Sequence, residues 1–187
     1  MKTSYWFWNN ILSKKQCLEI NNFIEKNYDT TEKTNSAATD INNNKIKYCD
    51  VKLIYWKKVK HFLEDIIDNC YLINQEEYGF NVWSICNNHY VNYNTYTSEN
   101  KSNYDWHIDC INHEKNADIK FTILINTSTD KYSGGELEQY SNGVHEVKEL
   151  TPGSVIMMPS YVYHRVKPMI SGQRKTLAIF IQGSKFV

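Results

Sequence analysis

Residues 150–160, Leu-Thr-Pro-Gly-Ser-Val-Ile-Met-Met-Pro-Ser, predict a turn, a buried strand and a second turn. Residues 161–166, Tyr-Val-Tyr-His-Arg-Val, predict the next strand, and residues 167–172 reverse the chain before another strand that runs to residue 182. Short apolar runs separated by Gly and Pro are typical of a β-sandwich, a jelly roll or a barrel. This stretch therefore favours a mainly β fold.

The same pattern extends upstream to about residue 80, which predicts roughly eight short strands. They are Asn81–Cys86, Tyr90–Tyr93, Lys120–Asn126, Glu136–Tyr140, Val144–Val147, Ser154–Met158, Tyr161–Val166 and Lys175–Gln182.

The region before residue 80 predicts supporting helices. Ser13 and Gln16 have the spacing of a capping box, which predicts a helix that begins near Lys14. A second helix is predicted by apolar residues at i, i+3, i+4, i+7, i+8 and i+11; these are Val59, Phe62, Leu63, Ile66, Ile67 and Cys70. Residues 29–50 are rich in Thr, Asn, Asp and Lys and predict a flexible excursion. We expect one domain over residues 1–187, with helical support in 1–79 and the β core in 80–187.

Composition narrows the classes of function. The chain has 187 residues, and its 21 basic and 21 acidic residues cancel to a net charge of zero, which argues against a nucleic-acid partner. Its 41% apolar and 14% aromatic content excludes a disordered chain. No apolar run has the length of a membrane span or the form of a signal peptide, so no membrane partner is expected. Five cysteines without a CxxC pair favour free thiols and a cytoplasmic location.

A first candidate site lies in Trp106-His107-Ile108-Asp109. On an extended segment the side chains of His107 and Asp109 leave the same face. One nitrogen and one oxygen ligand need a third partner to hold a redox metal, and His164 on the predicted strand 161–166 is the candidate. Two histidines and one carboxylate on one face suit non-haem Fe(II).

A second candidate lies ten residues beyond His164. Arg174 stands on the returning strand, where its side chain is expected deeper in the same cavity, and its guanidinium group is matched to a carboxylate in a way that Lys is not. The chain has nineteen lysines and only two arginines, Arg165 and Arg174.

Three segments together resemble a known family. They are Gly153–Pro168, which contains Pro159-Ser160 and His164, the Gly-Gly-Glu-Leu turn at residues 134–137, and Tyr104-Asp105-Trp106-His107-Ile108-Asp109. In this order they resemble the iron- and 2-oxoglutarate-dependent dioxygenases, and most closely the prolyl-4-hydroxylase-like and PKHD-type branches. The resemblance covers residues 80–183 and extends faintly over the N-terminal helices.

The resemblance implies a double-stranded β-helix, a jelly roll of cupin-like form, with Fe(II) held by His107, Asp109 and His164. It implies 2-oxoglutarate and O₂ as co-substrates, with ascorbate as a reductant. The far carboxylate of 2-oxoglutarate is expected on Arg174 and Thr176.

Three features around this site stay open in the sequence. A tyrosine is also expected on the 2-oxoglutarate carboxylate; Tyr93 is the family-like choice, and Tyr96 is its rival because the segment Asn94–Asn103 is longer than usual. This segment is interpreted either as a lid over the substrate or as a plain solvated loop. Tyr104, Trp106 and Tyr96 are candidates for an aromatic rim around the substrate, with strand-edge packing as the alternative.

The leading hypothesis for function is hydroxylation of an unactivated C–H bond, with peptidyl proline as the substrate. A free amino acid or another small metabolite is the alternative substrate, and a non-catalytic cupin-like binding module is the alternative of a different class. Oxidative nucleic-acid demethylation is disfavoured by the zero net charge and by Phe180, which stands where that branch carries a second arginine. The oligomeric state is left open.

Overall fold

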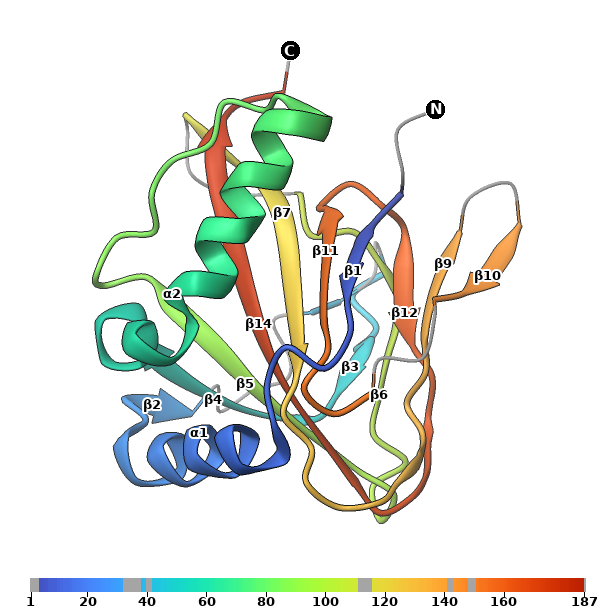
Figure 1. Ribbon diagram of the computed structural model, residues 1–187. Coiled ribbons are helices and arrows are strands. Elements are labelled where there is room, and N and C mark those ends of the chain that lie inside the picture. Colours follow the sequence, from blue (N-terminus) through green and yellow to red (C-terminus); the bar gives the residue numbers. More distant parts are fainter. Residues whose placement is uncertain are drawn as a thin grey trace.

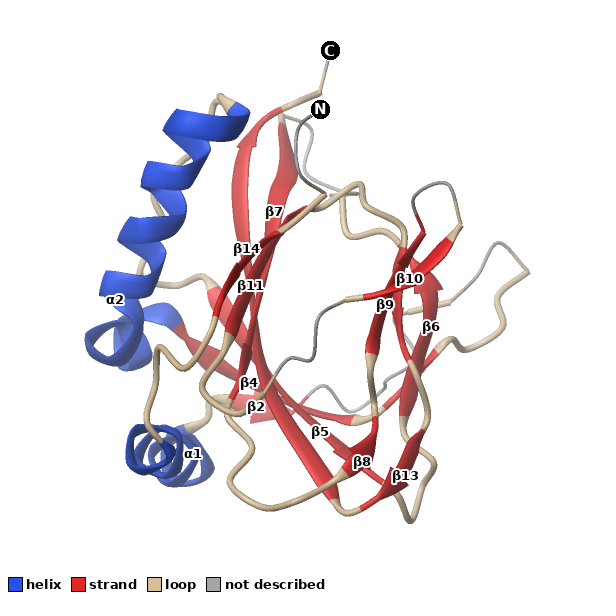
Figure 2. Cartoon of the chain, turned by 45° about the vertical axis from the view of Figure 1, so that its right-hand side comes forward, coloured by secondary structure: helices blue, strands red, loops and turns tan. Residues whose placement is uncertain are grey.

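The computed structural model describes residues 4–31, 38–39, 42–110, 116–140, 143–147 and 151–186. Within these residues two β-sheets face each other, and two α-helices pack on the outer surface of one of them (Figures 1 and 2). The predicted fold class, mainly β with supporting helices, is confirmed.

The larger sheet, here called the major sheet, is antiparallel throughout its described pairs. Its strands in spatial order are β1 (Trp6–Trp8), β11 (Val155–Pro159), β7 (Ala117–Asn126), β14 (Gln173–Ser184), β5 (Tyr90–Thr97), β4 (Asp50–Tyr55) and β2 (Thr30–Thr31).

The minor sheet lies opposite the major sheet (Figure 2). Its strands in spatial order are β10 (Val144–Glu146), β9 (Leu137–Tyr140), β12 (His164–Val166), β6 (Asn103–His107) and β3 (Lys47–Tyr48), and a separate ribbon pairs β13 (Met169–Ser171) with β8 (Ser133–Gly134). Along the chain, β5, β6, β7, β9, β11, β12 and β14 alternate between the major and the minor sheet. This alternation is the winding of a double-stranded β-helix.

The helices cover the outer face of the major sheet. They are α1 (Lys14–Asn27) and α2 (Trp56–Ile73), and α2 continues into the π-helical turn η2 (Asn74–Tyr78). The predicted capping box is present, because the N–H of Gln16 donates to the Ser13 hydroxyl and the N–H of Ser13 donates to the Gln16 side chain. Neither helix in the described part of the chain has the length and apolar run needed to cross a bilayer.

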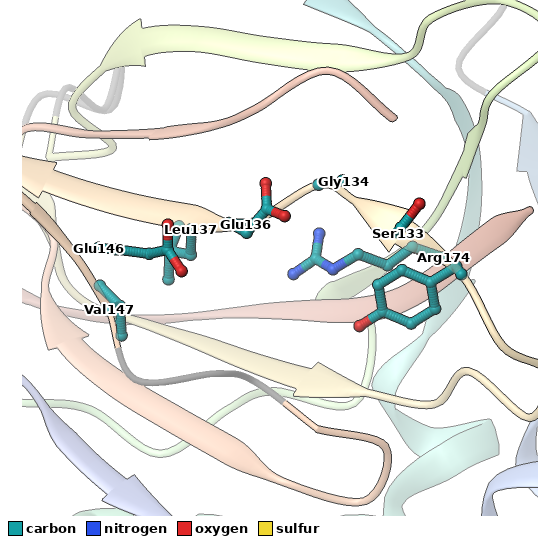
Figure 3. Close-up of a pocket in the computed structure, with 9 residues that line it drawn as sticks. Ser133, Gly134, Glu136, Leu137, Glu146, Val147 and Arg174 are labelled. Atoms are coloured by element: carbon teal, nitrogen blue, oxygen red, sulfur yellow. The ribbon is translucent and has the colours of Figure 1, made fainter. Parts of the chain in front are cut away.

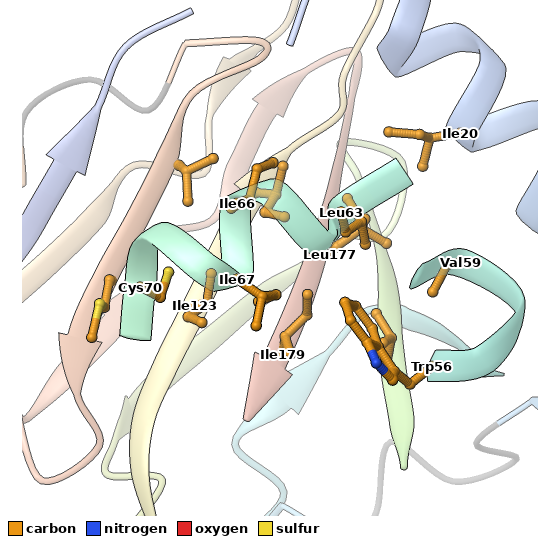
Figure 4. Close-up of a cluster of buried hydrophobic side chains, with 14 of the residues drawn as sticks. Ile20, Trp56, Val59, Leu63, Ile66, Ile67, Cys70, Ile123, Leu177 and Ile179 are labelled. Carbon is orange, nitrogen blue, oxygen red and sulfur yellow. The ribbon is translucent and has the colours of Figure 1, made fainter. Parts of the chain in front are cut away.

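The main hydrophobic core lies between α2 and the major sheet. Of the predicted apolar stripe of α2, five side chains are at most 6% exposed, and they are Val59, Leu63, Ile66, Ile67 and Cys70. Figure 4 shows them over the side chains of Ile123 on β7 and of Leu177 and Ile179 on β14. Burial of this stripe is the main contribution that fixes the helix to the sheet.

Side chains of the major sheet alternate between this core and the gap between the sheets. Toward the helices lie Val91 and Tyr93 of β5, Phe121, Ile123 and Ile125 of β7, and Leu177, Ile179 and Ile181 of β14. Toward the gap lie Asn92, Asn94 and Tyr96 of β5, Thr122 and Leu124 of β7, and Arg174, Thr176, Ala178 and Phe180 of β14. Residue parity along each strand therefore decides which side chains reach the interior cavity.

The N-terminal region departs from the prediction that it provides helices only. Strand β1 pairs with β11, β2 and β4 extend the major sheet beside β5, and β3 extends the minor sheet beside β6. The expected flexible excursion over 29–50 therefore contains β2 and β3, whereas its residues 32–37 and 40–41 lie outside the described part. These strands escape sequence patterns because their partners are distant; Lys47, for example, pairs with Tyr104.

Three C-terminal expectations also change. Of the expected strand Asn81–Cys86, only an isolated bridge between Val82 and Gly183 forms. In the predicted strand Tyr161–Val166, a turn occupies the start and β12 begins at His164. The segment Asn94–Asn103 is mostly strand and turn, because β5 of the major sheet continues to Thr97 and a turn then leads to β6 of the minor sheet, which begins at Asn103.

Candidate active site

The three predicted metal ligands lie together at one end of the minor sheet. His107 ends β6 and His164 begins β12, and the two residues are direct partners in the antiparallel ladder. Asp109 follows β6, where its N–H donates to the carbonyl of Ser160 at 2.9 Å. One ligand atom from each side chain lies within 4.8 Å of the others. The carboxylate oxygens of Asp109 are 3.6 Å from Nε2 of His107 and 3.5 Å from Nε2 of His164.

Hydrogen bonds fix the ring state of both histidines. Nδ1 of His107 lies 2.7 Å from the carbonyl of Asp105, and Nδ1 of His164 lies 2.8 Å from the carbonyl of Val162. Because a carbonyl oxygen only accepts, each Nδ1 carries the hydrogen and each Nε2 keeps its lone pair toward Asp109. Burial, reinforced by the neighbouring His164, lowers the pKa of His107 to about 3. His107 is therefore neutral near pH 7, as a metal ligand must be.

Asp109 is oriented by a residue that sequence reasoning missed. Thr122, on β7 of the opposite sheet, donates a hydrogen bond of 2.7 Å from its hydroxyl to the carboxylate of Asp109. A ligating carboxylate that is itself hydrogen-bonded is held in one orientation, which supports metal binding. Thr122 lies within the predicted strand 120–126. Its side chain alternates with those of the apolar residues at odd positions, and this alternation indicates that it faces the other side of the sheet.

The donor set tests which metal fits. Two neutral imidazole nitrogens and one carboxylate oxygen converge from one side, and the described part of the chain adds no further His, Cys, Asp or Glu to the group. This is the ligand combination that leaves open positions on Fe(II). The residues present thus fit an iron site with room for other ligands.

The cavity continues from the ligands between the two sheets to Arg174 on β14. Arg174 is only 2% exposed, and no carboxylate of the described residues forms an ion pair with it. Thr176 lies two residues further along β14 on the same face and also lines the cavity. A buried guanidinium group without an internal counter-charge is suited to an anionic ligand.

Arg174 also borders a second cavity, which lies against the turn at Ser133 and Gly134 (Figure 3). Gly134 and Gly135 have φ values of 79° and 72°. A Cβ at Gly134 would lie 2.5 Å from backbone atoms of Pro168 and Ile170, and one at Gly135 would lie 3.1 Å from Cδ of Arg174. The Gly-Gly turn therefore allows the backbone to approach both the β13 segment and Arg174.

The two candidate tyrosines are separated by the sheet. Tyr93 pairs with Leu177 and lies in the core beneath the helices, where its hydroxyl has no hydrogen-bond partner among the described residues. Tyr96 pairs with Arg174, and its ring lies 5.5 Å from the guanidinium carbon. The preference for Tyr93 thus does not match the geometry, which brings Tyr96 to Arg174 instead.

The candidates for the aromatic rim are divided by a β-bulge. Tyr104 pairs with Val166 and His107 pairs with His164, so one extra residue stands in β6 between these pairs. As a result Tyr104 and His107 both line the cavity, and their rings stack with centroids 3.4 Å apart. Trp106 is outside that lining; it stacks on Tyr163 at 5.1 Å beside Arg165. Tyr104 and Tyr96 line the cavity, and Trp106 does not.

Two further polar residues of the cavity have no counterpart in the sequence-based predictions. Lys47 of β3 is 8% exposed, and its ammonium group lies 5.2 Å from the centre of the Tyr104 ring. Asn94 of β5 is 4% exposed, and its Oδ1 has no hydrogen-bond partner among the described residues. Lys47 is not predicted as a site residue because its segment has no strand pattern. Asn94 is not predicted because the expected strand ends at Tyr93.

Comparisons with known proteins agree with this site. The model of the 2OG-Fe(II) oxygenase superfamily matches residues 90–182. A PKHD-type hydroxylase of Aliarcobacter butzleri is 30% identical over 185 residues, which cover 92% of this chain and 75% of that protein. A PKHD-type hydroxylase of Synechococcus sp. strain CC9605 is 36% identical over 74 residues, or 38% of this chain. That match spans only 32% of the Synechococcus protein.

Solved structures show the same fold. A Pseudomonas putida prolyl-4-hydroxylase aligns with a TM-score of 0.70 at 14% identity, over 97% of this chain and 94% of that one. A viral collagen prolyl hydroxylase of Paramecium Bursaria Chlorella virus-1, solved as a 2OG complex, aligns with a TM-score of 0.65 at 14% identity, over 97% of both chains. Since the Aliarcobacter relative matches most of both chains and the family model matches the segment that carries the site, this chain belongs to the 2OG-Fe(II) oxygenase superfamily, in its PKHD-type hydroxylase branch.

Proposed function

We propose that the protein is an Fe(II)- and 2-oxoglutarate-dependent dioxygenase that hydroxylates a peptidyl proline. The reaction consumes the substrate C–H bond, O₂ and 2-oxoglutarate and yields the hydroxylated product, succinate and CO₂. One oxygen atom of O₂ enters the product and the other enters succinate. The observation that carries this proposal is the convergence of His107, Asp109 and His164 in a cavity that also holds the unpaired guanidinium group of Arg174.

Each residue of the cavity then has a defined role. His107, Asp109 and His164 hold Fe(II), and Thr122 keeps the Asp109 carboxylate in place. Arg174 and Thr176 bind the far carboxylate of 2-oxoglutarate, and the ring of Tyr96 supports Arg174. The bound iron supplies the oxidising power for breaking an unactivated C–H bond. The protein binds, orients and encloses the reactants.

Peptidyl proline is favoured by the relatives rather than by the cavity. The structural neighbours include the Pseudomonas prolyl-4-hydroxylase and a Trichoplax adhaerens prolyl hydroxylase in complex with a peptide fragment of hypoxia inducible factor. The Trichoplax structure aligns with a TM-score of 0.67 at 16% identity. Tyr104, which lines the cavity beside His107, is suited to pack against a proline ring.

A reducing, cytoplasmic location is part of the proposal. It is supported by the five cysteines, none of which forms a disulfide bond in the described part of the chain.

The test is conversion of 2-oxoglutarate to succinate by the purified protein with Fe(II), O₂ and ascorbate. Proline-containing peptides are screened in the same reactions for a gain in mass of one oxygen atom. We expect His107→Ala to abolish succinate formation because the iron loses one of three protein ligands. His145→Ala, on the exposed strand β10, serves as the matched control and is expected to keep full activity. Full activity of His107→Ala would show that the ligand assignment is wrong.

A further inference from the structure

The cavity holds one more positive charge than its reaction needs. Lys47 and Arg174 are the two cationic side chains among the described residues that line it, and Asp109 is the one carboxylate. The charge of Fe(II) is balanced by the two carboxylates of 2-oxoglutarate, and Asp109 balances one of the two cations. One positive charge therefore stays uncompensated in a buried space, where an unpaired charge is costly.

Lys47 is the cation that is left over. Arg174 lies across from Tyr96 and beside Thr176 on the major sheet, where the 2-oxoglutarate carboxylate is proposed to bind. Lys47 lies on the opposite wall, in the minor sheet, where it pairs with Tyr104. Because the Tyr104 ring stacks on His107, Lys47 lies on the iron side of the cavity. No ion pair to Lys47 forms among the described residues.

A second observation points to a ligand in the same cavity, on the wall opposite Lys47. Asn94 lines the same cavity from the major sheet, is 4% exposed, and has an Oδ1 atom without a hydrogen-bond partner in the described part of the chain. A buried acceptor of this kind is satisfied by an N–H donor from a bound molecule. Within this one cavity, Lys47 on the minor sheet suits a carboxylate, and Asn94 on the major sheet, where it pairs with Thr176, suits an N–H donor.

We propose that Lys47 binds a carboxylate of the substrate that is hydroxylated, which makes Lys47 a specificity-determining residue. The inference rests on the proposed function and names the substrate class more closely. Two sources of the carboxylate share this chemistry: an acidic side chain beside the target proline in a peptide, and the α-carboxylate of a target proline that ends the peptide.

The first test compares matched substrates in the wild-type protein. One pair is a peptide with Glu beside the proline and the same peptide with Gln; the other is a peptide that ends in proline and the same peptide with a C-terminal carboxamide. We expect the charged member of one pair to have a KM about tenfold lower than its neutral analogue. The pair that shows the preference identifies the source of the carboxylate. Equal KM values within both pairs would overturn the proposal.

The second test removes the charge and keeps the apolar stem. In Lys47→Met the preference for the charged substrate should fall to about onefold, and Lys47→Arg should retain most of it. The KM for 2-oxoglutarate should change less than about twofold, and Lys45→Met, an exposed position two residues away, should behave as wild type. An equal rise in the KM for 2-oxoglutarate would assign Lys47 to the co-substrate and overturn the proposal. Thermal melting confirms that each variant is folded.

A binding measurement separates this proposal from the proposed function. Calorimetry on the protein loaded with Mn(II) and 2-oxoglutarate, which does not turn over, gives the Kd for each substrate of the two pairs. Discrimination between charged and neutral substrates that is present in wild type and lost in Lys47→Met supports the role of Lys47. Absence of turnover with Fe(II) for every substrate would instead contradict the proposed function, and the Kd values would still decide the role of Lys47.

Discussion

Thr122 connects the two sheets at the metal site, because its hydroxyl on β7 donates to Asp109 beside β6. Removing this hydroxyl frees the carboxylate to rotate away from the ligand position. We expect Thr122→Val, which keeps the side-chain shape, to raise the Fe(II) concentration for half-maximal succinate formation about tenfold. Thr122→Ser keeps the hydroxyl and is expected to stay near wild type. An unchanged iron requirement in Thr122→Val would show that Thr122 does not position the Asp109 carboxylate for metal binding.

Tyr96 and Tyr93 differ in their side of the sheet, and this difference is testable. The ring of Tyr96 lies beside the guanidinium group of Arg174, so Tyr96→Leu should raise the KM for 2-oxoglutarate several-fold, and Tyr96→Phe should raise it little. Tyr93→Phe removes a buried hydroxyl that lacks a hydrogen-bond partner among the described residues. It should therefore leave the KM for 2-oxoglutarate unchanged and should not lower the free energy of unfolding. A large rise in the KM for Tyr93→Phe would restore Tyr93 as the tyrosine of the site.

Helix α2 holds the major sheet from outside, on the face opposite the cavity. Leu63 is fully buried against that sheet, whereas Leu72 of the same helix is 54% exposed. We expect Leu63→Ala to lower the free energy of unfolding by about 2–5 kcal/mol and Leu72→Ala by less than about 0.5 kcal/mol, as measured by urea denaturation. Neither variant should change the KM for 2-oxoglutarate. Equal stabilities of the two variants would contradict the packing of α2.

The sequence predicted the elements whose pattern is local. The spacing of Val59 to Cys70 predicted α2, and turn residues around apolar runs predicted β7, β11 and β14 closely. Strands β1 to β4 were missed because each is defined by a distant partner rather than by its own residues. Tyr93 is the tyrosine that the family resemblance favours; the sequence does not determine the register of β5 with β14, which places Tyr96 opposite Arg174.

The three metal ligands were found because two of them stand close in the chain and the third begins a strand after a recognisable turn. The bulge in β6 was not predictable, because it appears only when β6 is paired with β12. It determines that Tyr104 faces the cavity together with His107 while Trp106 faces away. The ligand set is thus visible in the sequence, whereas the division of the aromatic side chains depends on the pairing of β6 with β12.

At the scale of the whole molecule, the two sheets enclose the cavity, and each sheet contributes different functional side chains. The minor sheet supplies His107, His164 and Lys47, and the major sheet supplies Arg174, Thr176 and Thr122. The outer face of the major sheet is covered by the helices and their core, and the cavity lies between the two sheets. Net charge is zero over the chain, whereas the described lining of this cavity carries two cationic side chains, Lys47 and Arg174, and one carboxylate, that of Asp109.

The central claim is that the cavity couples oxidation of 2-oxoglutarate to hydroxylation of a substrate. Its most direct test is a reaction under oxygen-18 gas with mass analysis of both products. The account predicts one labelled oxygen atom in succinate and a hydroxyl oxygen in the product peptide that derives from the same gas, in equal amounts when turnover is coupled. Succinate that forms without label, or hydroxylation that proceeds without 2-oxoglutarate, would contradict it.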